Sequence, residues 1–199
     1  MKQVLIETQL FKPSKGLLSE GKMSERGNPL VEGILATCEV ENGNGRYYSE
    51  DLWKREIDKY MELVRDNRAT GELDHPESQV INLKNVSHNI KDINWDGKNI
   101  MGTIELLPTP SGNILKALID SGITVGVSSR GMGSLEQKGE LMEVQDDFEL
   151  LCWDFVSTPS NPGSFMTLKE GKENNINQYA KANSIVTEIL CANGNCPIF

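Results

Sequence analysis

The chain has 199 residues, of which 38% are hydrophobic and 25% charged, and a formal net charge of −9 at pH 7. This length and composition are typical of one globular domain with its own core. The acidic balance argues against direct nucleic-acid binding, because phosphate groups are bound by clustered Lys and Arg. No apolar run reaches the roughly 18 residues that a membrane-spanning helix needs, and the N-terminus lacks the apolar stretch of a secretory signal. We therefore expect no nucleic-acid partner and no membrane partner.

Cysteine and histidine are too sparse for a metal centre. The four cysteines lie at positions 38, 152, 191 and 196, and there are two histidines. Cys38 and Cys152 lie in apolar, strand-like segments and are expected to be buried thiols. Cys191 and Cys196 share a polar C-terminal segment, but two thiolates are too few for a structural zinc site. We predict no metal and no cofactor, and a reducing, cytoplasmic setting.

Local patterns in the first half of the chain predict strands around one long helix. Ser49 fits an N-cap, and Glu50 and Asp51 favour the positive end of a helix. Apolar residues then recur at spacings of three to four, starting at Leu52 and Trp53, which gives one buried face. The expected elements are a short strand at 4–8, a loop to residue 28, a strand at 30–40, a turn at 41–45, the helix at 49–67 and a turn at 71–76.

The second half predicts mostly strands that are linked as hairpins. The expected elements are strands at 80–83 and 86–90, a hairpin over 93–107, a helix at 111–121 closed by Gly122, and strands at 123–129 and 147–157 that flank a charged stretch with room for a short strand. The fold class is α+β, mainly β with helices, arranged as a mostly antiparallel barrel or sandwich. We expect one domain over residues 1–170, with its core at about 30–167, and a polar tail over 171–199.

The segment 126–134 (GVSSRGMGS) carries two adjacent hydroxyls in an unusually glycine-rich stretch. Glycines let a backbone approach a substrate closely, and a nucleophilic serine needs donors placed for the oxyanion. Side chains alternate along a strand, so Ser128 points outward if Val127 points into the core. Ser128 is therefore the preferred nucleophile and Ser129 the second choice. The alternative is that both serines only satisfy the end of a strand.

A nucleophilic serine needs a base and an orienting group. His75 lies in the turn GELDHP, where side chains tend to be exposed, whereas His88 lies in a strand-like run and fits a core histidine. Asp154 is a lone carboxylate in an apolar strand, and a buried charge needs a partner such as histidine or arginine. Asp74, adjacent to His75, ranks lower, and His88 is a further candidate for the orienting role. A plain turn histidine and an aspartate facing water stay open as alternatives.

Three stretches together resemble a known family: GELDHP at 71–76, GVSSRGMGS at 126–134 and DFVSTPS at 154–160. They look like the prohead core proteases of T-even-like tailed bacteriophages, and the similarity runs from about residue 30 to 167. The resemblance implies a serine endopeptidase with a fold like herpesvirus assemblin, a closed antiparallel β-barrel surrounded by helices. By motif match the histidine is His75 and the serine is Ser128, and Asp154 matches the acidic third position.

The resemblance also implies where such an enzyme acts and what it cuts. Its relatives work inside the prohead in the host cytoplasm, and cleave scaffold, internal and major capsid proteins, and themselves, after a glutamate preceded two residues earlier by Leu or Ile. Glu170 and Glu20 fit that pattern as self-cleavage sites. Ser129, Arg130 and Gly131 become candidates for oxyanion or substrate binding, through backbone N–H groups or through contact of Arg130 with the substrate glutamate. Assembly into a homo-oligomer stays open.

Two other functions compete with this prediction. One is a non-catalytic capsid-assembly or scaffold-associated protein that keeps the same fold. The other is a different serine hydrolase, such as an esterase, which would usually show a Gly-x-Ser-x-Gly turn between a strand and a helix. The segment GVSSR at 126–130 lacks the final glycine. The sequence therefore favours the endopeptidase.

Overall fold

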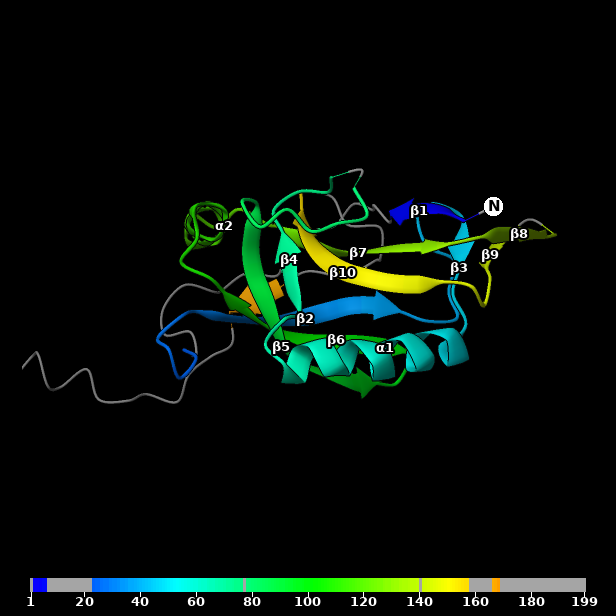
Figure 1. Cartoon of the computed structure of the whole chain (residues 1–199), viewed down its shortest axis with the longest axis horizontal. Coiled ribbons are helices and arrows are strands. Elements are labelled where there is room, and N and C mark those ends of the chain that lie inside the picture. The colour runs from blue at the N-terminus through cyan, green and yellow to red at the C-terminus, as the bar shows by residue number, and fades with distance from the viewer. Residues whose placement is uncertain (1, 7–22, 77, 140, 158–165, 169–199) are drawn as a thin grey trace, which may run out of the picture.

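The computed structural model describes residues 2–6, 23–76, 78–139, 141–157 and 166–168. They form eleven strands and two helices (Figure 1). In chain order these are β1 (Gln3–Ile6), β2 (Leu30–Thr37), β3 (Arg46–Tyr47), α1 (Glu50–Arg65), β4 (Thr70–Glu72), β5 (Val86–Asp96), β6 (Asn99–Leu106), α2 (Pro110–Asp120), β7 (Gly126–Gly133), β8 (Leu135–Lys138), β9 (Leu141–Val144), β10 (Glu149–Val156) and β11 (Met166–Leu168).

The strands form three sheets, which confirms the mainly β, α+β class. One sheet has the order β1-β7-β10, the second β11-β2-β6-β5-β4, and the third β3-β9-β8. All pairs are antiparallel except β3 with β9. Figure 1 shows β7 and β10 in one layer above β2 and β6. Neither helix of the described part has the length and apolar character needed to cross a membrane.

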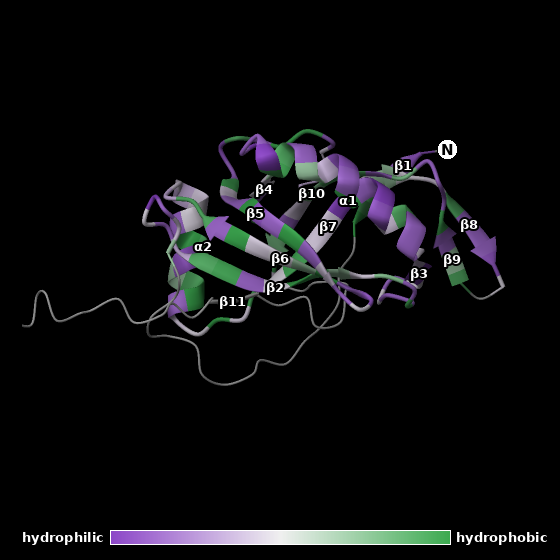
Figure 2. Ribbon diagram, turned by 90° about the horizontal axis from the view of Figure 1, so that it is seen from below, coloured by the Kyte–Doolittle hydropathy of each residue, from purple (hydrophilic) through white to green (hydrophobic). Residues whose placement is uncertain are grey.

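Helix α1 packs across the two larger sheets, against β5 of one and β10 of the other (Figure 2). Its start is the predicted one, since the Ser49 side chain accepts a hydrogen bond from the Leu52 N–H at 3.2 Å. Trp53 of the helix stacks on Trp153 of β10 with ring centroids 6.1 Å apart, and Tyr60 meets the same ring edge-on at 4.8 Å. These aromatic contacts fix the inner face of β10.

The expected closed barrel is wrong for the described residues, because no continuous ring of hydrogen-bonded strands joins the sheets. On one side β4 has only three residues, and a single parallel bridge, Leu73 with Phe155, links its end to β10. The Asp74 N–H adds one hydrogen bond to the Phe155 carbonyl at 2.7 Å. On the other side β2 lies near β7, but no described ladder pairs the two strands. The sheets therefore pack face to face and meet along one edge.

The glycine-rich segment differs most from the prediction. It forms strand β7 throughout, and the strand begins at Gly126 rather than at residue 123. A Cβ atom at Gly131 would lie 2.4 Å from Cε2 of Phe148, so this glycine makes room for a core ring and not for a substrate. Residues 80–83 form no strand, and the strand predicted at 86–90 continues as β5 to Asp96.

Strand β10 contains a β-bulge that sets its register against β7. Leu150 pairs with Gly131, but the next pair is Cys152 with Arg130, so Leu151 is the extra residue. The Leu150 N–H donates to a carboxylate oxygen of Glu56 on α1 at 3.0 Å, which satisfies a backbone donor beside the bulge. The register that follows the bulge sets Asp154 opposite Ser128 and Cys152 opposite Arg130.

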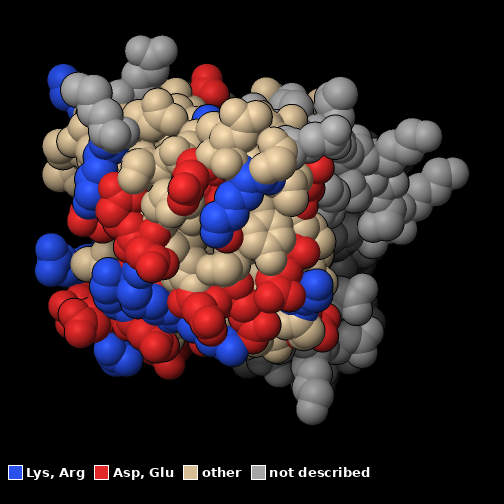
Figure 3. Space-filling view, turned by 90° about the vertical axis from the view of Figure 1, so that its right-hand side faces the viewer, with Lys and Arg blue, Asp and Glu red and all other residues tan. Residues whose placement is uncertain are grey.

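At the end of the molecule that holds β3, β8 and β9, charged side chains of both signs lie mainly over the left and lower parts of the view in Figure 3, and uncharged residues occupy much of its upper centre. Figure 3 shows Lys and Arg interspersed with Asp and Glu over this face, without a large area of one sign. Several of these charges form exposed ion pairs, for example Lys2 with Glu149 at 2.8 Å. Exposed pairs of this kind contribute little to stability.

Candidate active site

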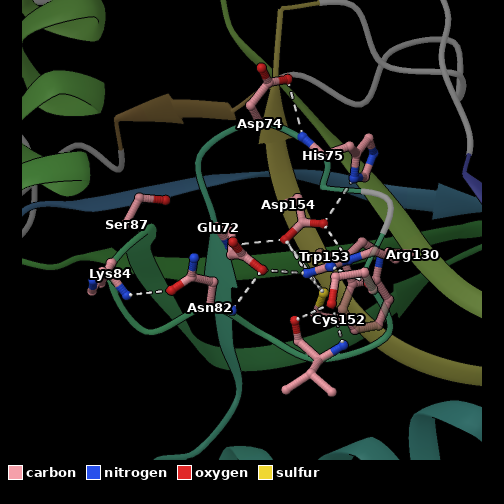
Figure 4. A network of polar contacts seen from close by, with 12 residues as sticks. Glu72, Asp74, His75, Asn82, Lys84, Ser87, Arg130, Cys152, Trp153 and Asp154 are labelled. Atoms are coloured by element: carbon pink, nitrogen blue, oxygen red, sulfur yellow. Dashed lines mark hydrogen bonds and ion pairs between the residues drawn. The ribbon is translucent and has the colours of Figure 1, made fainter.

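The imidazole of His75 contacts the carboxylate of Asp154. His75 lies in the loop after β4, and its Nδ1 is 2.8 Å from Oδ2 of Asp154 (Figure 4). Burial alone raises the pKa of Asp154, but hydrogen bonds from His75 and the Glu72 N–H and the charge of Arg130 outweigh it and hold the pKa below its ordinary value. The carboxylate is therefore ionised and can only accept. In neutral His75, Nδ1 carries the proton and Nε2 the lone pair.

The second ring nitrogen of His75 is buried without a hydrogen-bond partner among the described residues. The His75 side chain is 7% exposed, so water also has little access to it. An unsatisfied buried acceptor is costly and is uncommon in native structures. Its lone pair is free to accept a proton, which is what a general base requires.

Ser128 lies on the same side of the sheet as this pair. It is the direct cross-strand partner of Asp154, whereas Ser129 pairs with Trp153. Directly paired residues project from the same face with Cβ atoms about 4.5–5.5 Å apart. The Ser128 side chain therefore shares a face with the carboxylate that holds His75, and Ser129 projects from the opposite face.

The prediction that Ser128 points outward into solvent is wrong, because the residue is 0% exposed. The loop after β4 covers this face of β7. Ser78 and Asn82 of the loop bind the side chains of Arg130 and Glu72, which lie beneath it. Since Nε2 of His75 has no partner in the described part of the chain, the Ser128 hydroxyl is not hydrogen-bonded to it here.

The guanidinium of Arg130 is buried and engaged within the protein. It donates from NH1 to the Ser78 carbonyl at 2.7 Å and from NH2 to Oε1 of Glu72 at 3.0 Å. Its Nε lies 2.9 Å from Oδ2 of Asp154 as an ion pair, without the alignment of a hydrogen bond. Contact of this side chain with a substrate glutamate does not fit these positions.

The backbone groups of Arg130 and Gly131 also have structural neighbours on both sides. Arg130 pairs with Ile6 of β1 and with Cys152 of β10, and Gly131 pairs with Leu5 and Leu150. An N–H group in the middle strand of a sheet points at one of its two neighbouring strands. The expectation that these two N–H groups meet an oxyanion therefore does not fit the sheet.

His88 does not orient His75. It lies on β5, where Nε2 is 3.0 Å from the Trp153 carbonyl and Nδ1 is 2.8 Å from the Ser87 hydroxyl. Burial lowers the pKa of His88 to about 4, so the ring is neutral. Because a carbonyl can only accept, Nε2 carries the proton and Nδ1 accepts from Ser87. Gly71 makes this contact possible, since a Cβ there would lie 2.5 Å from the His88 ring.

Comparison with known proteins agrees with the sequence motifs. A family model described as prohead core protein serine protease matches residues 7–176. The chain belongs to this family. A prohead core protein protease of Enterobacteria phage T4 is 34% identical over 145 residues, which are 70% of this chain and 68% of the relative. The solved structure of the bacteriophage T4 capsid assembly protease matches with a TM-score of 0.69 and 30% identity, covering 78% of this chain and 98% of the other.

Some residues predicted for this prohead protease family member lie outside the site or outside the described residues. The Asp74 carboxylate accepts the backbone N–H of His75 and does not touch the ring. Glu20 and Glu170 fall in the parts of the chain that are not described. Within the described ranges, no group of three or more His, Cys, Asp and Glu side chains is arranged to hold a metal ion.

Sequence reasoning gave no role to Glu72, which belongs to the GELDHP motif. Glu72 is 0% exposed and accepts from both Arg130 and the Asn82 N–H, while its own N–H donates to Oδ1 of Asp154 at 2.9 Å. The sequence argument that a buried Asp154 needs a histidine or arginine partner could have led to Glu72. Both partners occur, and a buried arginine in turn requires a second carboxylate.

Proposed function

We propose that this chain is a serine endopeptidase in which Ser128 is the nucleophile, His75 the general base and Asp154 the orienting carboxylate. The observation that carries the proposal is the contact of Asp154 with Nδ1 of His75, which leaves Nε2 with its lone pair unused. Membership of the prohead core protein serine protease family supports the reaction class. The cross-strand pairing of Ser128 with Asp154 supports the choice of serine.

In the proposed reaction, Nε2 of His75 removes the Ser128 proton as the hydroxyl oxygen attacks the scissile carbonyl. Asp154 stabilises the imidazolium that forms. The imidazolium then gives its proton to the leaving amine, the peptide bond breaks, and an acyl-serine ester remains. Water attacks this ester with His75 again as base, which releases the new carboxyl terminus and restores the serine.

Substrate binding has to bring Ser128 and His75 into direct contact. Catalytic hydrogen bonds are often long or poorly aligned without substrate and tighten in the complex. For the oxyanion we retain Ser129 through its backbone N–H, since the residue after the nucleophile commonly supplies one donor.

The relatives are named a prohead core protein protease and a capsid assembly protease. By that likeness we propose that the enzyme acts inside the phage prohead on scaffold, internal and major capsid proteins, cleaving after glutamate in Leu-x-Glu or Ile-x-Glu sequences. It also processes itself at one or both of Glu170 and Glu20, and cleavage after Glu170 removes the 171–199 tail from a protease domain over 1–170. Mass spectrometry of incubated active protein should show new termini after these residues.

Cleavage of a Leu-x-Glu peptide by the wild type and two single variants tests the proposal. Ser128→Ala should lose at least about 10⁴-fold in turnover, because nucleophile and base act as a unit. Ser129→Ala is the matched control, with the same chemical change one residue away on the opposite face, and should stay within about tenfold. If Ser128→Ala still cleaves the peptide and Ser129→Ala does not, Ser129 and not Ser128 is the nucleophile. A wild type that never cleaves would favour the non-catalytic assembly protein.

A further inference from the structure

A buried pair of opposite charges lies directly beneath the His75–Asp154 contact. The Arg130 and Glu72 side chains are 1% and 0% exposed, and their closest atoms are 3.0 Å apart. Arg130 also touches both oxygens of Asp154, with Nε 2.9 Å from Oδ2 and NH2 3.4 Å from Oδ1. Oδ2 is the oxygen that holds His75. The same carboxylate therefore serves the imidazole and the guanidinium (Figure 4).

The charges of this cluster cancel only in part. Burial alone lowers the pKa of Arg130, but the neighbouring Cys152, Asp154 and Glu72 together raise it above its ordinary value, so the guanidinium stays charged. Oε1 of Glu72 accepts from Arg130 and from the Asn82 N–H, both at 3.0 Å, and Glu72 forms an ion pair with the guanidinium. With two carboxylates and one guanidinium in contact, the imidazole faces one net negative charge. Such charges act strongly at short range away from water.

We infer that Arg130 and Glu72 are positioning residues that set the charge felt by His75. Arg130 offsets the charge of Asp154, and Glu72 offsets that of Arg130, so the imidazolium is stabilised by one unit of charge and not by two or none. The inference rests on the proposed function only in giving His75 a catalytic role. The charge arrangement itself follows from the contacts of the described residues.

The other titratable groups around the site carry no charge into it near neutral pH. From β10, burial raises the pKa of the Cys152 thiol, which stays protonated. From α1, burial raises the pKa of Tyr60, and from β5 the buried His88 is neutral. The Asp74 carboxylate belongs to an exposed residue and binds a backbone N–H. Among the described residues, the two buried carboxylates and Arg130 are therefore the charges that face His75.

Changing either member of the pair should move the titration of His75, and in opposite directions. Glu72→Gln removes one negative charge, which disfavours the imidazolium and moves the titration midpoint of His75 to lower pH. Arg130→Gln removes the positive charge and moves the midpoint to higher pH. Each shift should be about one pH unit, at the lower end of what a neighbouring charge produces. A role in folding alone would not give shifts of opposite sign.

The experiment follows the ring proton of His75 by NMR between pH 5 and 9 in the full chain. The only other histidine, His88, has its pKa lowered to about 4, so its signal is a reference that stays constant over that range. Arg130→Lys is the control that keeps the charge and should leave the midpoint near that of the wild type. If Arg130→Gln fails to fold, Glu72→Gln decides alone, since its amide oxygen can still accept from Arg130. An unchanged or higher midpoint in Glu72→Gln overturns the inference.

The same variants in the peptide-cleavage assay separate this inference from the proposed function. The acidic limb of the pH–rate profile should follow the NMR midpoint, to lower pH in Glu72→Gln and to higher pH in Arg130→Gln. Shifted NMR midpoints in a protein whose Ser128→Ala variant still cleaves would support the charge arrangement and overturn the proposed function. Unshifted midpoints together with cleavage that depends on Ser128 would overturn only the charge arrangement.

Discussion

The two histidines of this chain bind consecutive residues of the same strand, yet their surroundings are opposite. His75 reaches the Asp154 side chain from a loop, and its second nitrogen has no partner in the described part of the chain. His88 reaches the Trp153 carbonyl from β5, and both of its nitrogens are bonded. Nε2 of His88 donates to a backbone carbonyl and Nδ1 accepts from the Ser87 hydroxyl, so neither nitrogen is available to a substrate or to Ser128. His88 is therefore unsuited to act as a general base although it lies close to the site. His75 is suited to that role because the lone pair of its Nε2 is unused.

The two rings also differ in how burial affects them. His88 has no carboxylate partner, its ring packs edge-on against Phe155 with centroids 4.8 Å apart, and burial keeps it neutral. His75 has a carboxylate partner, with its Nδ1 2.8 Å from Oδ2 of Asp154. His88 thus ties β5 to β10 and supports the strand that carries Asp154. The predictions below separate a catalytic ring from a structural one.

Among the substitutions that compare the two histidines, Asp154→Asn should have the largest effect. An amide cannot hold Nδ1–H in the same way, so the imidazole loses its tautomer and the stabilisation of its charged form. Turnover on a Leu-x-Glu peptide should fall about 10⁴-fold. The assay is run at a temperature where circular dichroism shows the variant folded, since Arg130 also loses a partner. Asp74→Asn is the control and should stay within a few-fold, whereas a loss below about tenfold in Asp154→Asn would remove Asp154 from the proposed triad.

The next effect concerns the pH dependence of stability through His88. Its pKa is lowered from 6.5 to about 4 in the folded protein, so the unfolded chain binds more protons between these values. Stability therefore falls as the pH drops from about 6.5 towards 4, by on the order of 2 kcal/mol. The lowered pKa of Asp154 affects stability only at pH values below 3.8, the ordinary pKa of an aspartate. Asp154 stabilises the fold above that pH, and this contribution is lost as the pH falls through its pKa in the folded protein.

His88→Gln should remove this fall while lowering stability at pH 7. Urea unfolding at pH 7 and pH 4.5 measures the difference in the free energy of unfolding between the two conditions. His75→Gln is the matched comparison and should not remove the fall, because it leaves the buried His88 in place. An undiminished slope in His88→Gln would show that other groups cause the pH dependence, and the two histidines would then not differ as described.

The smallest effect is expected for Ser87→Ala. The substitution leaves Nδ1 of His88 without its hydroxyl donor, which should cost about 1–2 kcal/mol of stability. Peptide turnover by the folded variant should be unchanged, because the bond lies on the structural histidine. Thermal unfolding and the cleavage assay measure the two quantities. Lost turnover with unchanged stability would mean that His88 takes part in the reaction after all.

Local patterns in the sequence predicted the elements whose cause is local. The cap of α1 at Ser49 and its apolar face follow from spacing, and α2 begins one residue before the predicted start because Thr109 caps it at Pro110. The extent of strand β7 and the role of its glycines were predicted wrongly. Gly131 makes room for the ring of Phe148, a residue distant in sequence, and no local pattern reveals that contact. The number of strands was also underestimated, since β3 and β4 are only two and three residues long.

Only those parts of the site that follow from the chemistry of a single residue could be predicted from the sequence. A lone carboxylate in an apolar strand demanded a partner, and the structure places both His75 and Arg130 on Asp154. The role of Glu72 required knowing that Arg130 turns inward. That depends on the register of β7 and β10, which no local pattern records. Glu56, which supports this register, lies 94 positions from the Leu150 N–H that it binds.

The extra residue in β10 decides which chemical group lies opposite the serine. Counted straight on from the Leu150–Gly131 pair, the strand would set the indole of Trp153 opposite Ser128 and move Asp154 to Val127. One inserted position restores a carboxylate opposite the hydroxyl and sends the indole to the aromatic layer beneath α1. The one-residue bulge therefore replaces an aromatic side chain opposite Ser128 with an acidic one. The spacing of residues along β10 matters as much as their identity.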